Sequence, residues 1–267
     1  MDQHDHTPES TPEVSASRRQ LLATGLALGG SMAVSMPLWA QSGPIKIGHL
    51  TPMTGFLGAL GEYAAQGIKM AADEINASGG VLGRQLEVLT EDSVNPQVAA
   101  TKAQRMIERD QVAFLMGEIS SASALTISQV AARNKKLFMS IGARSDVLRG
   151  KDCNRYTFHV DIPVTVMVNA VGQALLRDNM VRGKRIFSLT ADYLFGHDLS
   201  KVARKFWANN GGTLVGDELV PTDATDFSPY LVKIRQARPD LIASNLAGNQ
   251  VTNFVKQYAE FGLPYPV

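Results

Sequence analysis

Two serines and an arginine are the residues whose types and positions could recognise an anion. Ser120 and Ser121 stand where a buried strand, residues 112–116, turns into a helix. A helix N-terminus carries unpaired N–H groups and a partial positive charge, so it can bind a carboxylate, an amide or a phosphate. Arg144, after the next strand, would add a guanidinium that favours a carboxylate. Simpler interpretations stay open: the serines could only cap the helix, and Arg144 could pair with Asp146 at the surface.

Other side chains could serve acid–base catalysis. Glu118 lies in the same turn, and Asp192 and His197 flank a short loop further along the chain. Each could act as a general base, or could equally be a cap or a solvated charge. The segment GFLGALG, residues 55–61, lacks the spacing of a dinucleotide fingerprint, and no hydrolase or P-loop motif occurs. The single Cys153 excludes a multi-cysteine metal site. The sequence therefore predicts no enzyme, no cofactor and no metal.

Composition and charge point to a small-molecule ligand. The chain has 267 residues, of which 45% are hydrophobic, with 26 basic and 25 acidic side chains. This length can bury a core and build one or two domains. A nearly neutral chain gives no reason to expect nucleic acid or an anionic membrane surface as a partner.

Residues 1–40 have the layout of an export signal. A polar leader is followed by Arg18 and Arg19, and then by an apolar, small-residue run over residues 21–39. The adjacent arginines resemble twin-arginine signals. We expect cleavage near Ala40 and a protein located in the periplasm.

From residue 44 onward, the elements that must position these side chains alternate between strand and helix. Strands are expected at residues 45–50, 85–91, 112–116, 137–140, 185–190, 213–219 and 241–244. Helices are expected at residues 63–76, 95–109, 164–177, 196–209, 226–236 and 251–260, besides the one after the central strand. This order predicts an α/β fold with parallel sheets. We expect two lobes, 41–159 and 160–267, with residues 156–163 as the crossover between them.

Several segments, in order, resemble one known family. The opening IKIGHLTPMTGFLGALGEYAAQGIKMAADEINASGGVLG is followed by MGEISSASA, GARSD, DYLFG and DATDFSPYLVKIRQARPDLI. They resemble type I periplasmic substrate-binding proteins of the branched-chain amino acid (Leu/Ile/Val) ABC transporter family. The resemblance implies two Rossmann-like lobes, a hinge, a ligand in the cleft between the lobes and delivery to an ABC permease. Relatives continue well past residue 267, so we expect the C-terminal part of the second lobe to be missing.

The resemblance also implies ligand contacts, with departures from the family pattern. The helix-opening serine of the family falls on Ser121, and Arg144 replaces a threonine. An aromatic residue becomes Leu60, a tyrosine becomes Phe195, and a later aromatic residue falls near Leu246. The expected ligand-binding set is Ser120, Ser121, Gly142, Ala143, Arg144, Leu60, Tyr193, Phe195 and Leu246.

The expected function is that of a periplasmic solute-binding protein for an ABC importer. Its ligand would be a small carboxylate or an amino acid-like molecule, with amides also considered. Because polar partners of an α-amino group are replaced, the departures favour a carboxylate on an apolar or aromatic body over leucine. A ligand sensor on the same fold is an alternative, and a Rossmann-like enzyme is a weaker one.

Overall fold

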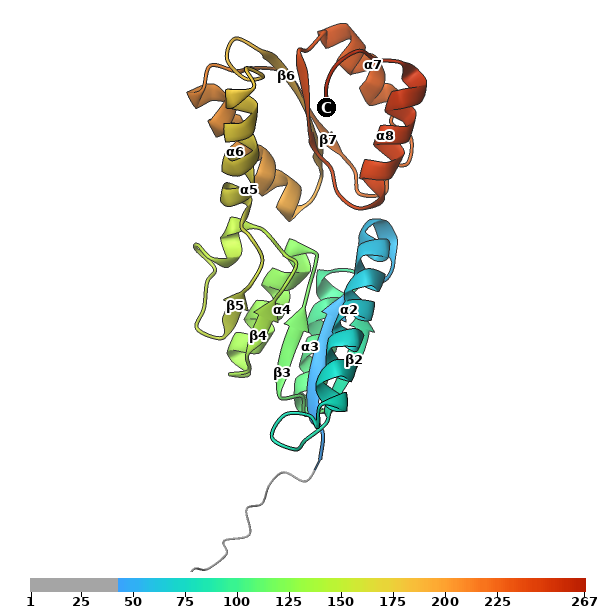
Figure 1. Cartoon of the computed structure of the whole chain (residues 1–267), viewed down its shortest axis with the longest axis vertical. Helices are drawn as coiled ribbons and strands as arrows, with labels where there is room; N and C mark the ends of the chain where they lie inside the picture. Colours follow the sequence, from blue (N-terminus) through green and yellow to red (C-terminus); the bar gives the residue numbers. More distant parts are fainter. Residues whose placement is uncertain (1–42) are drawn as a thin grey trace, which may run out of the picture. The chain divides into compact units, whose positions relative to one another are not determined.

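Two parallel sheets organise residues 43–267, which are the residues that the computed structural model describes (Figure 1). The predicted leader and export signal, residues 1–40, lie outside the described residues. The first sheet has the strand order β2-β1-β3-β4-β5 and the second has β7-β6-β8. The strands are β1 (Ile45–Thr51), β2 (Leu86–Asp92), β3 (Phe114–Gly117), β4 (Phe138–Ser140), β5 (Thr157–His159), β6 (Arg185–Ala191), β7 (Thr213–Val220) and β8 (Leu241–Asn245).

Seven α-helices lie between or after these strands within the described part of the chain. They are α2 (Gly58–Ala77), α3 (Pro96–Glu108), α4 (Ser121–Arg133), α5 (Val164–Arg177), α6 (Leu194–Asn209), α7 (Ser228–Ala237) and α8 (Asn249–Phe261). Short 3-10 turns, η1 (Gly55–Leu57) and η2 (Asp146–Leu148), follow β1 and β4. No helix among these is long and apolar enough to cross a bilayer.

The start of α3 shows how local sequence determines an element. The Asn95 side chain accepts a hydrogen bond from the backbone N–H of Val98 at 2.9 Å, and Pro96 occupies the first turn. Asparagine satisfies one of the free N–H groups, and proline has none to satisfy. The helix predicted at residues 95–109 is therefore confirmed, with its first helical residue at Pro96.

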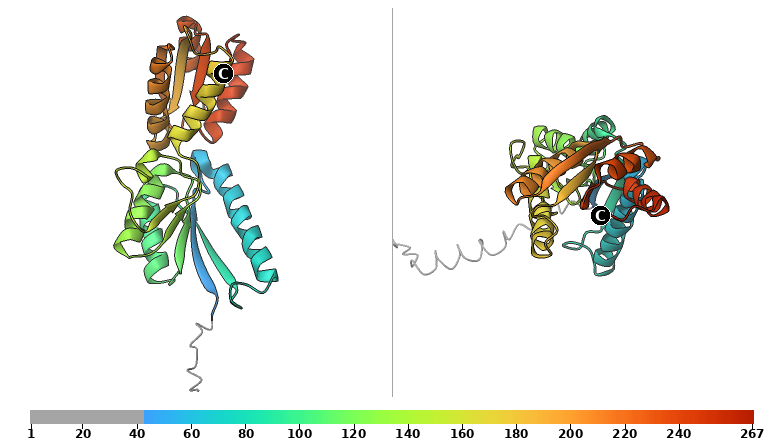
Figure 2. Two further views of the ribbon diagram at one scale, coloured as in Figure 1. Left: turned by 60° about the vertical axis from the view of Figure 1, so that its left-hand side comes forward. Right: turned by 90° about the horizontal axis from the view of Figure 1, so that it is seen from above.

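The first sheet is covered unequally on its two faces. Helices α3 and α4 pack side by side on one face, as Figures 1 and 2 show, and bury a core that includes Leu50, Met106, Leu115, Ile127 and Phe138. Helix α2 lies on the other face, against β1 and β2. Only three of its residues are buried, two glycines and one alanine. The hydrophobic core of this sheet therefore lies on the α3/α4 side.

The second sheet buries both of its faces. Along β6, Ile186 packs into a cluster with residues of α5 and α6, whereas Phe187 and Leu189 pack into a cluster with residues of α7 and α8. Side chains alternate between the faces of a strand, so consecutive apolar residues can fill two different cores. The predicted α/β fold with parallel sheets is confirmed.

The structure differs from the sequence prediction at residues 156–163. Thr157–His159 pairs with β4 in parallel and forms the fifth strand of the first sheet. The segment is therefore not only a crossover. It is short, and Phe158 is 51% exposed, so it lacks the apolar run that marks a buried strand. The division into lobes at residues 159 and 160 stays a prediction.

Candidate functional site

A pocket of about 390 Å³ lies where loops from both sheets meet at the carboxyl ends of their strands. The expected residues Leu60, Gly142, Arg144, Tyr193 and Phe195 all contribute to its wall. Sequence reasoning missed the other lining residues, which are Leu57, Ala64, Ile119, Ile141, Asp161 and Ala247. Ligand sites of parallel α/β sheets commonly lie at such strand ends. The pocket is mostly apolar and carries one arginine and one aspartate.

Four residues of the expected set lie outside the pocket wall. Ser120 caps α4, because its side chain accepts a hydrogen bond from Ser123 N–H at 3.4 Å. Ala143 is fully buried beside the pocket, and Leu246 packs into the second sheet's core while its neighbour Ala247 faces the pocket. These residues do not line this pocket, and the expectation that they bind a ligand stays a prediction.

Ser121, the fourth, holds the loop that follows β4. Its hydroxyl oxygen accepts hydrogen bonds from the backbone N–H groups of Arg144 and Ser145, both at 3.2 Å. The Ser121 side chain is completely buried. The serine that sequence reasoning assigned to the ligand therefore shapes the wall that carries Gly142 and Arg144.

Arg144 pairs with Asp161 rather than with Asp146. Its Nε–H donates to Asp161 Oδ2 at 2.7 Å, and both residues line the pocket. Asp146 instead accepts hydrogen bonds from the backbone and hydroxyl of Thr165. The Asp146 pairing considered from the sequence is therefore wrong, and the arginine's charge is balanced inside the pocket.

Aromatic rings form another part of the pocket wall. Tyr193 and Phe195 lie with ring centroids 5.9 Å apart, and Tyr193 also meets Phe56 edge to face at 5.2 Å. Burial raises the pKa of Tyr193, and the positive charge of Arg144 opposes this only in part. The phenol therefore stays neutral at physiological pH, and it offers an apolar ring with one polar end.

The loop that carries Arg144 is also anchored by α6. Asp198 Oδ2 accepts hydrogen bonds from Ser145 Oγ–H at 2.9 Å and from Asp146 N–H at 2.7 Å. Since Ser145 is fully buried, losing the acceptor would leave its hydroxyl without this partner. The Asp198 carboxylate of α6 therefore holds the Arg144 loop in addition to Ser121.

We expect Asp198→Ala to lower the free energy of unfolding by about 2 kcal/mol, because hydrogen bonds to a charged group are lost in a buried setting. Urea unfolding of the full chain would measure this. A suitable control is Asp192→Ala, since Asp192 pairs with His197 at the surface at 2.6 Å and exposed pairs contribute about 1 kcal/mol or less. Equal losses in the two variants would contradict the anchoring role.

The groups considered for catalysis do not meet at the pocket. Asp192 and His197 bind each other at 2.6 Å, with about half of each side chain exposed, and neither lines the pocket. Glu118 is 1% exposed and its Oε1 accepts hydrogen bonds from the N–H groups of Ile119 and Ser120, at 3.0 and 2.9 Å. Glu118 therefore fixes the turn that brings Ile119 to the pocket.

The environment of Glu118 favours the protonated form of its carboxyl group. Burial raises the pKa of Glu118 to about 7, while the backbone hydrogen bonds from Ser120 and Ile119 oppose the shift and the charge of Asp92 adds to it. Its Oε2 atom has no hydrogen-bond partner among the described residues. The unpaired oxygen is consistent with a carboxyl group that is costly to ionise.

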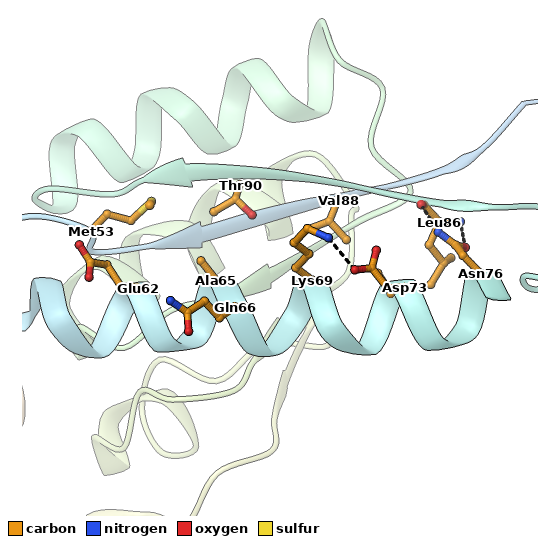
Figure 3. A pocket seen from close by; sticks show the side chains of 11 residues that line it. Met53, Glu62, Ala65, Gln66, Lys69, Asp73, Asn76, Leu86, Val88 and Thr90 are labelled. Carbon is orange, nitrogen blue, oxygen red and sulfur yellow. Dashed lines mark hydrogen bonds and ion pairs between the residues drawn. The ribbon is translucent and has the colours of Figure 1, made fainter. Parts of the chain in front are cut away.

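A larger hollow, of about 670 Å³, lies between α2 and β2, and Figure 3 shows the side chains along it. Its lysine, Lys69, forms an ion pair with Asp73 at 2.5 Å. Asn76 accepts from Leu86 N–H at 2.7 Å and donates to the Leu86 carbonyl at 2.9 Å. These polar groups already bind one another, so the smaller pocket at the strand ends is the better candidate site.

A parallel α/β architecture with a pocket at the strand ends defines a ligand-binding class of fold, and comparison with known proteins identifies the family. A family model described as periplasmic binding protein matches residues 44–267. The chain belongs to this family, and its fold is the type I periplasmic binding protein fold. The resemblance to the branched-chain amino acid group is thereby confirmed.

Three similar proteins illustrate the relationship. The Leu/Ile/Val-binding protein homolog 7 of Brucella abortus (strain 2308) is 28% identical over 228 residues, which cover 83% of this chain and 57% of the relative. A periplasmic binding protein of Burkholderia mallei is 33% identical with a TM-score of 0.75, covering 82% of this chain and 58% of that one. A solute-binding protein of Rhodopseudomonas palustris BisB5, in complex with 3,4-dihydroxybenzoic acid, is 26% identical with a TM-score of 0.74, covering 82% and 59%. The chain thus spans less than two thirds of each relative.

Proposed function

We propose that this chain is the solute-binding component of an ABC importer and that it works in the periplasm. It captures a small carboxylate or amino acid-like solute in the 390 Å³ pocket. The observation that carries the proposal is an arginine set in an otherwise largely apolar wall at the strand ends. Family membership and the signal-like residues around Arg18 and Arg19 support the periplasmic location.

Arg144 gives the pocket its affinity for a carboxylate. The Nε–H of Arg144 is used by Asp161, whereas a guanidinium has five N–H donors in all. The remaining donors can bind a ligand carboxylate, and the apolar wall can cover the ligand's body. The names of the similar proteins support both ligand kinds, since one is named for leucine, isoleucine and valine and another was solved with an aromatic acid.

Capture follows from contacts that both sheets make with one solute. Ile119, Gly142 and Arg144 come from loops of the first sheet, and Tyr193 and Ala247 from loops of the second. A ligand that touches both groups stabilises the arrangement in which they face each other. The permease would then recognise that arrangement.

A thermal-shift screen of the full chain tests the proposal. Ligands should be branched-chain amino acids, small amides and aromatic carboxylates, because a solute that binds only the folded state raises the melting temperature. We expect a shift with at least one carboxylate-bearing class.

Arg144→Ala should weaken binding of that solute by about tenfold or more, since a charge-assisted hydrogen bond contributes about 1.5–3 kcal/mol. Calorimetric titration of the variant measures the loss. Arg133→Ala is the matched control, because Arg133 is exposed at the end of α4 and does not line the pocket. If no solute class shifts the melting temperature, or if both variants bind like the wild type, the proposed site is wrong.

A further inference from the structure

His159, the last residue of β5, contacts the loop after β4 through both nitrogens of its ring. Its Nε2 atom bonds to the backbone carbonyl of Ala143, the residue immediately before Arg144. Its Nδ1 atom lies 2.7 Å from Nε of Arg149, which directly follows η2 in the same loop. The side chain of His159 is partly buried. The imidazole therefore ties the end of β5 to the loop that carries Arg144.

The partners of the two nitrogens determine the protonation state of this imidazole. A guanidinium N–H can only donate a hydrogen bond, so Nδ1 of His159 accepts from Arg149 and carries no proton. A carbonyl oxygen can only accept, so the Nε2–H of the ring donates to Ala143. A ring with one donor nitrogen and one acceptor nitrogen is neutral. Both contacts can therefore exist together only while His159 is uncharged.

Arg149 extends this arrangement to the pocket wall. Its Nη2 atom donates to the backbone carbonyl of His159 at 3.2 Å and to that of Asp161. The carboxylate of Asp161 in turn accepts from Nε of Arg144 at 2.7 Å, and both of these residues line the pocket. The position of the imidazole therefore affects the backbone next to each charged residue of the pocket.

Protonation of His159 would break this arrangement. A proton on Nδ1 would point at the Arg149 guanidinium, so the hydrogen bond would be lost and two positive charges would face each other. Burial lowers the pKa of His159, and the charge of Arg149 also lowers it. The Ala143 carbonyl and the carboxylates of Asp161 and Asp146 oppose this shift only in part. The surroundings of the ring therefore favour its neutral form.

We propose that His159 and Arg149 are positioning residues, which hold the pocket in its solute-binding conformation only while the imidazole is neutral, so that solute binding weakens in acidic medium. This inference rests on the proposed function. Protonation would separate Arg149 from His159, and the Asp161 carbonyl would lose the donor that holds it. The apparent affinity for the solute falls with the fraction of protein that keeps the binding-competent conformation.

The direction of the pH effect follows from linkage. The pKa of His159 is lowered in the arrangement that binds the solute, and it returns to about 6.5, the ordinary histidine value, when the ring is released. Affinity is therefore fully present above about pH 6.5 and is lost as pH falls below that value.

Nuclear magnetic resonance of the histidine rings tests the protonation state without any solute. In the nitrogen-labelled full chain, the signals of His159 are assigned by their absence from His159→Gln. We expect the Nε2–H tautomer at about pH 7.5, and titration of the ring below about pH 6.5. The Nδ1–H tautomer, or titration at or above the ordinary histidine pKa, would overturn the proposal.

Calorimetric titration of the full chain at about pH 7.5 and about pH 5.5 tests the effect on affinity, with leucine and benzoate as probes. One histidine can weaken binding by at most about tenfold at one pH unit below its ordinary pKa, so we expect the wild-type dissociation constant to rise by about fivefold. Glutamine offers one donor and one acceptor but does not titrate, so the dissociation constant of His159→Gln should not rise. Arg149→Ala removes the group that repels the protonated ring, so its rise should be smaller than in the wild type.

His197→Gln is the matched control. His197 binds Asp192 at the surface and does not line the pocket, so this variant should show the same rise as the wild type. No rise in the wild type, or an equal rise in His159→Gln, would overturn the proposal while the solute-binding function stands. Should His159→Gln fail to fold, the rise in Arg149→Ala decides in the same way. Wild-type protein that binds neither probe also overturns this inference, and the broader thermal-shift screen then decides the proposed function separately.

Discussion

Gly248→Ala should reduce solute affinity by about thirtyfold, the equivalent of roughly 2 kcal/mol. Gly248 immediately precedes α8, and a Cβ atom added there would lie 2.0 Å from the carbonyl oxygen of Phe56. That oxygen belongs to the turn after β1, so the substitution forces a loop of the first sheet away from a helix of the second. The conformation in which loops of both sheets line the pocket would then be less populated. The apparent affinity for the solute falls in proportion to the fraction of protein in this binding-competent conformation.

Titration of the variant with the best solute measures the loss, and Gly262→Ala is the matched control. Gly262 also has a positive φ, +65° against +53° for Gly248, but an added Cβ at Gly262 meets no atom within 4 Å. Alanine at Gly262, which lies in the left-handed region (φ 65°, ψ 37°), costs about 1 kcal/mol of backbone strain. Gly248 (φ 53°, ψ −134°) lies in a region that alanine disfavours more strongly, so Gly248→Ala carries extra backbone strain in addition to the collision with Phe56. A thirtyfold loss in both variants, or in neither, would show that this contact does not control binding.

The second large effect concerns pH. Glu118→Gln should change the pH dependence of stability, because the pKa of Glu118 is raised by burial from 4.5 to about 7. The folded state holds this proton more tightly than the unfolded state, so the associated stability is present at low pH and is lost as pH rises from 4.5 through 7. Glutamine carries no charge at any pH. The stability of the variant relative to the wild type should therefore rise by about 3 kcal/mol between pH 4.5 and 8.

In the wild type, His49 has the opposite effect on the pH dependence of stability. Burial lowers the pKa of His49 from 6.5 to about 4, so protonation of the unfolded state costs stability as pH falls from 6.5 towards 4. Between pH 4.5 and 6.5, the contribution of Glu118 lowers stability as pH rises, whereas the contribution of His49 raises it. We expect a flat wild-type curve and a rising Glu118→Gln curve over this range.

Urea unfolding at a series of pH values would measure both curves. Glu74→Gln, which changes an exposed glutamate on α2, is the control and should run parallel to the wild type. Parallel curves for Glu118→Gln as well would mean that the buried carboxyl group does not keep its proton in the folded protein.

The sequence predicted the fold best where periodicity was strong. Buried parallel strands are apolar without alternation, as Leu115 and its neighbours are. In the helices between the strands, apolar residues recur every three to four positions. The first residues of the helices were predicted less accurately from the sequence. Helix α2 begins at Gly58, five residues before the predicted start, because its first turns contain glycines and small residues that carry no hydrophobic period.

The pocket was predicted only in part, because its key ion pair depends on a short strand. Arg144 and Asp161 are 17 residues apart, and nothing in their spacing links them. The link comes from the pairing of Ser140 with His159 in β4 and β5, which brings the loops after these strands to the same edge. A strand prediction at residues 157–159 would have placed Asp161 near Arg144. Its three residues, one of them exposed, gave too weak a signal.

Each sheet takes its strands from one continuous stretch of chain. All strands of the first sheet precede residue 160, and all strands of the second lie between residues 185 and 245. During synthesis, the five strands that the structure describes in the first sheet are therefore all available as soon as His159 has left the ribosome. Its hydrogen bonding does not have to wait for β6, β7 or β8, which shortens the time for which its parallel strand edges stay unpaired and prone to aggregation.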